Sequence, residues 1–151
     1  MKDFSMNVRF MDNMIAKLRE LDIDMYLIIT GEGADPIPLT CFGVDTVGSS
    51  AYVFTKAGDK VALASTIDAQ DVEESGMFHR VERYTDYYPD LAALVKRFPH
   101  GKIALNYSED DPLCDGLTMG KHTQFLEAMG GDTFAECSSD LFIPAVQAMT
   151  K

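Results

Sequence analysis

The sequence predicts an α/β domain in which helices flank a mixed β-sheet. Apolar segments with strand character alternate with helical segments along most of the chain, which is typical of strands joined by helices. One pair of strand segments is separated only by a turn signal, which predicts an antiparallel hairpin. The length of 151 residues suits one domain with a single sizeable core.

The chain begins with an amphipathic helix followed by a strand. Apolar residues recur at helical spacing between charged ones, at Val8, Met11, Met14, Ile15, Leu18 and Leu21. We expect Asp3, Ser5 or Asn7 to cap this helix. Residues 25–30 are nearly all apolar, as expected for a strand that is covered on both faces. Two glycines and two prolines make residues 31–38 a loop, and residues 39–43 form a helical turn or a bridge back into the core.

The predicted hairpin comes next. Residues 50–55 and 60–65 are apolar strand segments on either side of the turn Ala57-Gly58-Asp59. Residues 66–75 then form a short helix that Thr66 or Asp68 caps. Residues 77–84 alternate well enough between apolar and polar side chains to predict another strand.

The second half of the chain repeats the strand and helix alternation. Residues 89–98 have apolar side chains at helical spacing, with Pro89 in the first turn. Residues 102–106 and 133–137 are short strand segments, and the later part of residues 117–129 is helical. Ser138, Ser139 and Asp140 are expected to cap a last helix that runs into Lys151.

The net charge of the chain excludes several classes of partner, and its cysteines indicate the compartment. Acidic side chains outnumber basic ones by 24 to 13, so the net charge is -11. Nucleic acids and anionic membrane surfaces attract basic faces, and we therefore expect neither as a partner. The apolar runs are too short to span a bilayer, and no secretory leader is recognisable. Three widely spaced cysteines without a C-x-x-C pair predict reduced thiols in a cytoplasmic protein.

The motifs that carry catalysis or cofactor binding are incomplete. Gly31-x-Gly33 follows an apolar strand, but Pro36 replaces the third glycine of a dinucleotide-binding fingerprint. His79, His100 and His122 are isolated, and the acidic run at residues 109–111 is interpreted as a solvated turn. Cys41 and Cys114 are interpreted as buried structural cysteines. We therefore predict no catalytic residue, no metal site and no cofactor in this chain.

Several segments together resemble a known family. The helix containing Lys-Leu-Arg-Glu-Leu, the strand at residues 25–30 and the segment Leu39-Thr40-Cys41-Phe42 are similar to the N-terminal domain of creatinases and prolidases. The hairpin at residues 52–63 and the segments at residues 103–108 and 115–120 are also similar to that domain. Residues 139–151 resemble the linker helix that leads into the family's pita-bread catalytic domain. Cys41 departs from the usual glycine of the L-T-G-F-like segment, and Gln147 lies near a common arginine.

The resemblance implies a fold and a role. It implies a ribonuclease H-like fold without ribonuclease activity, with residues 1–137 as the domain and residues 138–151 as the start of the linker helix. The chain would then be the non-catalytic N-terminal domain of a metal-dependent Xaa-Pro dipeptidase or aminopeptidase (prolidase or aminopeptidase P), a hydrolase. In that family a C-terminal domain, absent here, binds two divalent metal ions (manganese, cobalt or zinc) through Asp, Asp, His, Glu and Glu ligands.

The family's assembly implies partners and candidate contacts. The partners would be the chain's own C-terminal catalytic domain and the second subunit of a homodimer. In such dimers the N-terminal domain leans over the neighbouring active site and restricts the access of substrate. The resemblance points to the loop at residues 31–38 and the following aromatic residue for this role, with Asp35, Pro36 and Phe42 as candidate substrate-proximal residues.

Two other functions remain open from the sequence. Related domains with inactive catalytic partners occur in histone-binding chaperones, so the chain could be a stand-alone protein- or peptide-binding module, and its acidic charge would fit a basic partner. A small independent enzyme that uses Cys41 or Cys114 as a nucleophile is the remaining hypothesis. The sequence does not distinguish a dipeptidase from an aminopeptidase or a creatinase-like amidinohydrolase as the parent enzyme.

Overall fold

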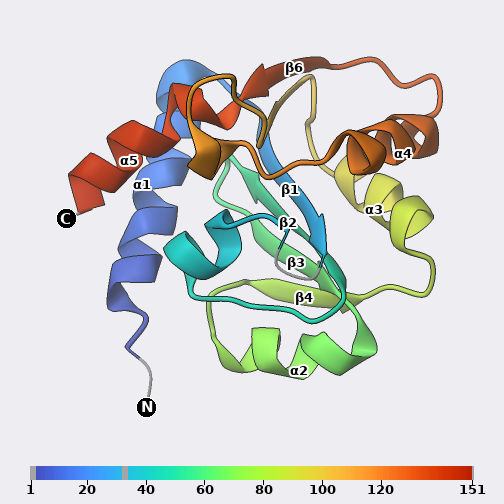
Figure 1. Cartoon of the computed structure of the whole chain (residues 1–151), viewed down its shortest axis with the longest axis horizontal. Coiled ribbons are helices and arrows are strands. Elements are labelled where there is room, and N and C mark those ends of the chain that lie inside the picture. The colour runs from blue at the N-terminus through green and yellow to red at the C-terminus, as the bar shows by residue number, and fades with distance from the viewer. Residues whose placement is uncertain (1–2, 32–33, 151) are drawn as a thin grey trace.

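The computed structural model describes residues 3–31 and 34–150, and these form one mixed six-stranded sheet with helices on both faces (Figure 1). The strands are β1 (Met25–Gly31), β2 (Ser49–Thr55), β3 (Lys60–Ala64), β4 (Arg80–Arg83), β5 (Lys102–Leu105) and β6 (Ala135–Ser138). The helices are α1 (Ser5–Leu21), α2 (Thr66–Glu74), α3 (Tyr87–Lys96), α4 (Met119–Met129) and α5 (Ile143–Thr150). The element order predicted from the sequence and the α/β fold class are confirmed.

The sheet order is β4-β3-β2-β1-β5-β6. β1, β2 and β3 pair antiparallel, with Leu27 opposite Val53 and Val53 opposite Val61. β4, β5 and β6 each join the sheet by parallel pairing. The predicted hairpin forms the antiparallel pair of β2 and β3. The later strands that follow a helix, β4, β5 and β6, pair in parallel, as such connections predict.

Alternate residues of β1 contribute to two separate hydrophobic cores, which explains its continuous apolar sequence. Tyr26 and Ile28 lie in the core that α1, α2 and α5 cover, whereas Leu27 and Ile29 lie in the core under α3 and α4. Figure 1 shows α1 and α5 on one side of the sheet and α3 and α4 on the other. Because successive side chains of a strand point to opposite faces, a central strand covered on both sides must be apolar throughout.

The sequence misplaced several helix boundaries. Ser65, and neither Thr66 nor Asp68, caps α2: its backbone is extended and its hydroxyl accepts the Asp68 N–H at 3.2 Å. Phe4 occupies the cap position of α1 without a side-chain cap, although the Asp3 carboxylate accepts the Ser5 N–H at 2.9 Å. These errors follow from local backbone geometry, since several adjacent polar residues could each act as a cap.

Two strand boundaries also differ from the prediction. The strand expected over residues 77–84 is only β4, because β4 is an edge strand that pairs solely with Val61–Ala64 of β3. β6 covers Ala135–Ser138, whereas the sequence predicted a strand over residues 133–137; the division into a domain over residues 1–137 and a linker from residue 138 stays a prediction. Beyond β6 a 3₁₀ turn (Ser139–Leu141) precedes α5, which packs on α1 and buries Ile143 and Val146. That this segment leads toward a further domain stays a prediction.

Candidate functional site

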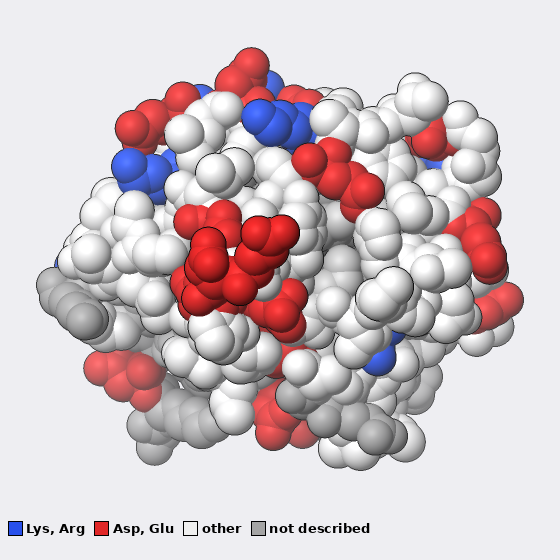
Figure 2. All heavy atoms as spheres, turned by 45° about the horizontal axis from the view of Figure 1, so that its top comes forward, with Lys and Arg blue, Asp and Glu red and all other residues white. Residues whose placement is uncertain are grey.

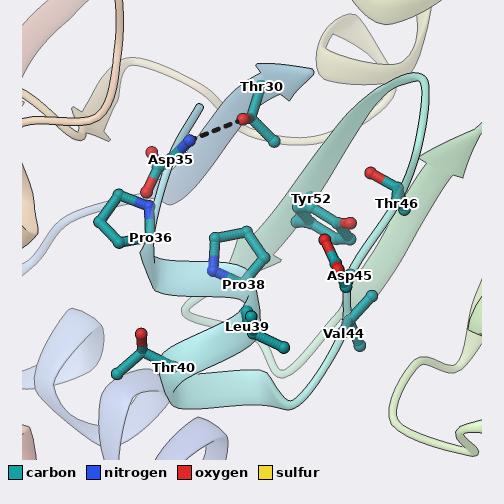
Figure 3. A pocket seen from close by; sticks show the side chains of 10 residues that line it. All are labelled: Thr30, Asp35, Pro36, Pro38, Leu39, Thr40, Val44, Asp45, Thr46 and Tyr52. Atoms are coloured by element: carbon teal, nitrogen blue, oxygen red, sulfur yellow. Dashed lines mark hydrogen bonds between the residues drawn. The ribbon is translucent and has the colours of Figure 1, made fainter. Parts of the chain in front are cut away.

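The site lies where β1 ends, beside the loop that the sequence singled out. A pocket of about 260 Å³ opens between the end of β1, residues 35–46 and β2 (Figure 3). Ten side chains line it: Thr30, Asp35, Pro36, Pro38, Leu39, Thr40, Val44, Asp45, Thr46 and Tyr52. Residues 32 and 33, which include Gly33 of the predicted loop, lie outside the described residues. Two of the three predicted substrate-proximal residues, Asp35 and Pro36, therefore line one pocket.

Asp35 fixes the path of the chain after β1. Its backbone N–H donates to the Thr30 hydroxyl at 3.0 Å, and its Oδ1 accepts the Ile37 N–H at 3.0 Å. Its Oδ2 accepts Nδ2 of Asn106 at 2.7 Å. Asp35 is 3% exposed, and burial raises the pKa of its carboxyl, although the bonds from Asn106 and Ile37 offset part of this effect. The carboxylate is thus a structural acceptor at the base of the pocket.

Asn106 extends this contact into a buried network. Its Oδ1 accepts the hydroxyl groups of Tyr26 and Ser139, each at 2.6 Å. The backbone of Gly116 closes over Asp35, because a Cβ at Gly116 would lie 2.4 Å from Cγ of Asp35. The network joins β1, the loop after it, the end of β5 and the turn before α5. Three stretches that are distant in sequence, residues 26–35, Asn106 and Ser139, therefore hold the pocket in place.

A wide helical turn of the π type (Pro38–Phe42) forms the outer part of the pocket. Leu39 and Thr40 face outward, while Phe42 is fully buried with ring centroids 5.0 Å from Phe54 and 6.0 Å from Phe10. Gly43 ends the turn with a φ of 71°, which favours glycine. Phe42 does not line the pocket and anchors the turn from the core side. The structure thus separates Phe42 from Asp35 and Pro36.

The opposite wall carries a chain of hydroxyl groups that the sequence did not indicate. The Thr46 and Ser50 hydroxyls lie 3.0 Å apart, and the Ser50 hydroxyl lies 3.2 Å from that of Tyr52. Burial raises the pKa of Tyr52, so this hydroxyl is protonated at neutral pH. Asp45 stands exposed at the rim. The lining is uncharged or acidic, and its oxygen atoms suit the N–H or ammonium groups of a peptide.

Among the described residues, the histidine and acidic side chains do not come together as a metal site. Among them no group of three or more His, Cys, Asp or Glu side chains is placed to hold a metal ion. His100 pairs with Asp132 at 2.7 Å, and His122 pairs with Glu136 at 2.6 Å, so each of these histidines has a single carboxylate partner. The acidic run at residues 109–111 forms a turn in which the Asp111 N–H donates to the Ser108 hydroxyl at 3.0 Å. The interpretation of that run as a turn is confirmed.

The two cysteines considered as nucleophiles are buried. Burial raises the pKa of the Cys41 thiol to about 12, and the nearby Cys114 and Asp35 add to the shift. Burial likewise raises the pKa of Cys114 to about 12. The thiolate is the nucleophilic form, so neither residue is activated in this environment. The structure therefore gives no support to a cysteine-dependent enzyme.

Within residues 3–31 and 34–150, no helix combines the length and the apolar character that crossing a bilayer requires.

Comparisons with known proteins agree on the fold. The X-Pro aminopeptidase of Thermotoga maritima matches 92% of this chain with a TM-score of 0.67 and 16% identity, over 35% of its own length. The N-terminal domain of the Xaa-Pro dipeptidase of Lactobacillus brevis matches 92% of this chain and 98% of its own, with a TM-score of 0.62 and 16% identity. The N-terminal domain of the cytoplasmic peptidase PepQ of Mycobacterium tuberculosis matches 91% of this chain and 97% of its own, with a TM-score of 0.64 and 13% identity.

The chain thus spans about a third of the full-length Thermotoga maritima structure but nearly all of each separate N-terminal domain. No protein-family model and no curated protein sequence matches it. At these identities the likeness shows the fold, which is that of the N-terminal domains of Xaa-Pro peptidases.

Proposed function

We propose that this chain is the non-catalytic N-terminal domain of a metal-dependent Xaa-Pro dipeptidase or aminopeptidase, where it assists dimer assembly and restricts the access of substrate. The observation that carries the proposal is the extent of the structural match. The chain corresponds to nearly the whole of the separate Lactobacillus brevis domain and to about a third of an intact X-Pro aminopeptidase. Such an enzyme acts in the cytoplasm, in keeping with the Mycobacterium tuberculosis relative described as a cytoplasmic peptidase.

The catalytic metal ions would belong to another domain. The described residues do not fit a two-metal site, because none of their His, Cys, Asp and Glu side chains form a suitable group. Two divalent ions (manganese, cobalt or zinc) would be held by a C-terminal domain that forms the catalytic site. The partners of this chain are then that domain and the second subunit of a homodimer.

The pocket after β1 would provide the contact with substrate. Pro36 and Leu39 form an exposed rim, while Asp35 holds the rim in place from below. Phe42 contributes by anchoring the turn, since it is fully buried. In this role the pocket narrows the approach to the neighbouring active site, so that long peptides are disfavoured relative to short ones.

A combined assay tests this function. The purified chain should release no proline from an Xaa-Pro dipeptide with manganese or cobalt, and clear turnover would contradict the proposal. In the intact peptidase, the double substitution Pro36→Ala/Leu39→Ala should raise kcat/KM for longer peptides relative to the dipeptide, with an unchanged kcat for the dipeptide. Pro99→Ala, an exposed proline outside the pocket, is the matched control. Equal effects of both variants on selectivity would argue against the role of the rim.

A stand-alone protein- or peptide-binding module is the second candidate function, and a surface feature favours it. The acidic patch consists of Glu109, Asp110, Asp111, Asp115 and Asp140, and the Ser108 hydroxyl donates to Asp140 at 2.7 Å within it. No ion pair among the described residues includes a member of this patch. Figure 2 shows a dense group of acidic side chains near the middle of one face, surrounded mainly by uncharged side chains.

Charge of this kind attracts a basic partner and makes binding sensitive to salt. A pull-down with immobilised lysine-rich peptides tests the second candidate. Retention at low salt that is lost at high salt supports it, whereas no retention at low salt contradicts it.

A further inference from the structure

We propose that the free edge of β6 and the apolar pocket beside it bind an extended peptide segment of a partner protein, in which an apolar residue is flanked by lysine or arginine. The segment would add a strand to the sheet. This inference deepens the second candidate function and rests on it, because it names the surface and the class of peptide. It does not depend on whether the chain belongs to a peptidase.

The first supporting feature is an unpaired strand edge. β6 is the last strand of the described sheet and pairs only with β5. The Ala135 N–H donates to the carbonyl of Gly101 at 2.8 Å, so Ala135 faces β5. Backbone groups alternate along a strand, which directs the N–H and C=O of Glu136 to the free edge. Both residues are exposed. Such an edge is a template for an added strand.

The second feature is a pocket directly beside that edge. It has a volume of about 280 Å³ and is lined by Tyr107, Leu117, Thr118, Met119, His122 and Glu136. Met119 is 87% exposed and Tyr107 is 43% exposed, which is unusual for large apolar side chains next to one another. Because Glu136 belongs to both the strand edge and the pocket, one bound segment can contact both. An added strand would direct every second side chain toward the pocket.

The pocket is fixed by bonds between the elements around it. Nε2 of His122 and Oε2 of Glu136 lie 2.6 Å apart and join α4 to β6. The Leu117 N–H donates to the carbonyl of Asn106 at 2.8 Å, and the Ser138 hydroxyl donates to the carbonyl of Tyr107. A preformed site of this kind loses little conformational entropy when a peptide binds.

The third feature, charge, selects the occupant. The acidic patch begins at Glu109, two residues after Tyr107 of the pocket, and includes Asp140, two residues after the end of β6. A segment that lies along β6 therefore passes from the apolar pocket to the patch, where lysine or arginine is favoured. A second copy of this chain carries the same net charge of -11 and offers no basic segment that matches the patch. Like-charge repulsion disfavours that pairing.

A labelled peptide tests the proposal on the whole chain. The probe is fluorescein-labelled Lys-Lys-Thr-Val-Phe-Val-Thr-Lys-Lys, followed by fluorescence anisotropy. Two control probes carry glutamate in place of every lysine, or proline in place of both valines. We expect binding of the first probe at low salt, weaker binding at high salt, and none of either control probe. Amide shifts in ¹⁵N spectra should cluster at β6 and at Tyr107, Leu117 and Met119.

Matched variants locate the contact. Met119→Lys should weaken the probe about tenfold because it places a cation at the apolar pocket, whereas Leu126→Lys, on the same helix but outside the pocket, should weaken it less than about twofold. Glu136→Pro removes the outward N–H of β6 and should weaken binding about tenfold. Glu136→Gln alters only the side chain and is the control, so it should weaken binding less than Glu136→Pro.

Three outcomes would overturn the proposal. The first is unchanged affinity in both Met119→Lys and Glu136→Pro. The second is a set of amide shifts confined to the acidic patch, which would leave a basic-partner module but not this site. The third is concentration-dependent dimerisation abolished by Glu136→Pro, which would show that a second copy occupies the edge. None of these outcomes changes the result expected in the peptidase assays. A failure of this proposal can therefore be told apart from a failure of the proposed peptidase function.

Discussion

Nδ2 of Asn106 donates a 2.7 Å hydrogen bond to Oδ2 of Asp35, and this buried contact joins the end of β5 to the loop after β1 across 71 positions of sequence. Asn106 simultaneously accepts the hydroxyl groups of Tyr26 and Ser139. One side-chain amide thus forms hydrogen bonds with three buried polar groups. The shape of the pocket depends on it, because the network holds the loop that carries Asp35 and Pro36.

Replacing Asn106 with leucine should therefore destabilise the domain strongly. Asn106→Leu keeps the volume but removes the hydrogen bonds that Asn106 makes with Oδ2 of Asp35 and with the hydroxyl groups of Tyr26 and Ser139, so we expect a loss of about 3–5 kcal/mol in the free energy of unfolding. Urea denaturation measures this value. Asn13→Leu, which removes one half-buried bond to Thr150, should cost about 1 kcal/mol. Similar losses in the two variants would contradict the importance of the network.

Gly116 should tolerate no side chain. A Cβ there would lie 2.4 Å from Cγ of Asp35 and 2.7 Å from each carboxylate oxygen, so Gly116→Ala should lower the free energy of unfolding by about 1–3 kcal/mol. Gly120→Ala is the matched control. No atom of the described residues lies within 4 Å of a Cβ added at Gly120, which lies in the first turn of α4, and alanine there should be neutral or stabilising by up to about 1 kcal/mol. Thermal unfolding of both variants measures these changes in stability, and equal stability of the two would contradict the close contact at Gly116.

Asp68 should make stability depend on pH. Burial alone would raise the pKa of its carboxyl, but the N–H groups of Val47 and Gly48 and the Ser65 hydroxyl outweigh burial, so the pKa is lowered. A lowered pKa in the folded state stabilises the fold above the unfolded value of about 3.9, and that stability is lost as the pH falls through the folded-state pKa.

We expect Asp68→Asn to lower the free energy of unfolding by about 1–3 kcal/mol at pH 7, with the difference from the parent protein shrinking below pH of about 4. Urea denaturation at several pH values measures both quantities. Asp71→Asn, an exposed change in the same helix, should stay within about 0.5 kcal/mol at each pH. A constant difference across the pH range would show that the charge of Asp68 is unimportant.

Cys41 and Cys114 should resist thiol reagents in the folded protein. Both are at least 95% buried, and burial raises the pKa of each to about 12, so almost no thiolate forms at pH 8. Cys137, which is only partly buried, should be labelled first, and all three cysteines should react in urea. Mass spectrometry after alkylation identifies the sites. Rapid labelling of Cys41 under native conditions would revive the hypothesis of a cysteine nucleophile.

Much of the fold could be predicted from the sequence because it depends on local patterns. The continuous apolar run of β1 identified a strand buried on both faces, and Ala57-Gly58-Asp59 identified the turn between β2 and β3. The ends of the helices and strands were predicted less accurately, as the cap of α2 at Ser65 and the short β4 show. A cap depends on which backbone is extended, and the length of an edge strand depends on its single partner.

The candidate site, too, could be predicted only where a local sequence pattern indicated it. Asp35 and Pro36 were proposed from their shared loop and line one pocket, and their contact with substrate stays a prediction; Thr46, Tyr52 and Asn106 had no local signal that linked them to that loop. Phe42 follows the loop in sequence yet points into the core. The sequence alone determined the order of helices and strands, since that order follows from the periodicity of apolar residues along the chain. The tertiary structure alone decided which polar groups meet around Asp35, because a hydrogen bond joins atoms that are near in space, whatever their separation along the chain.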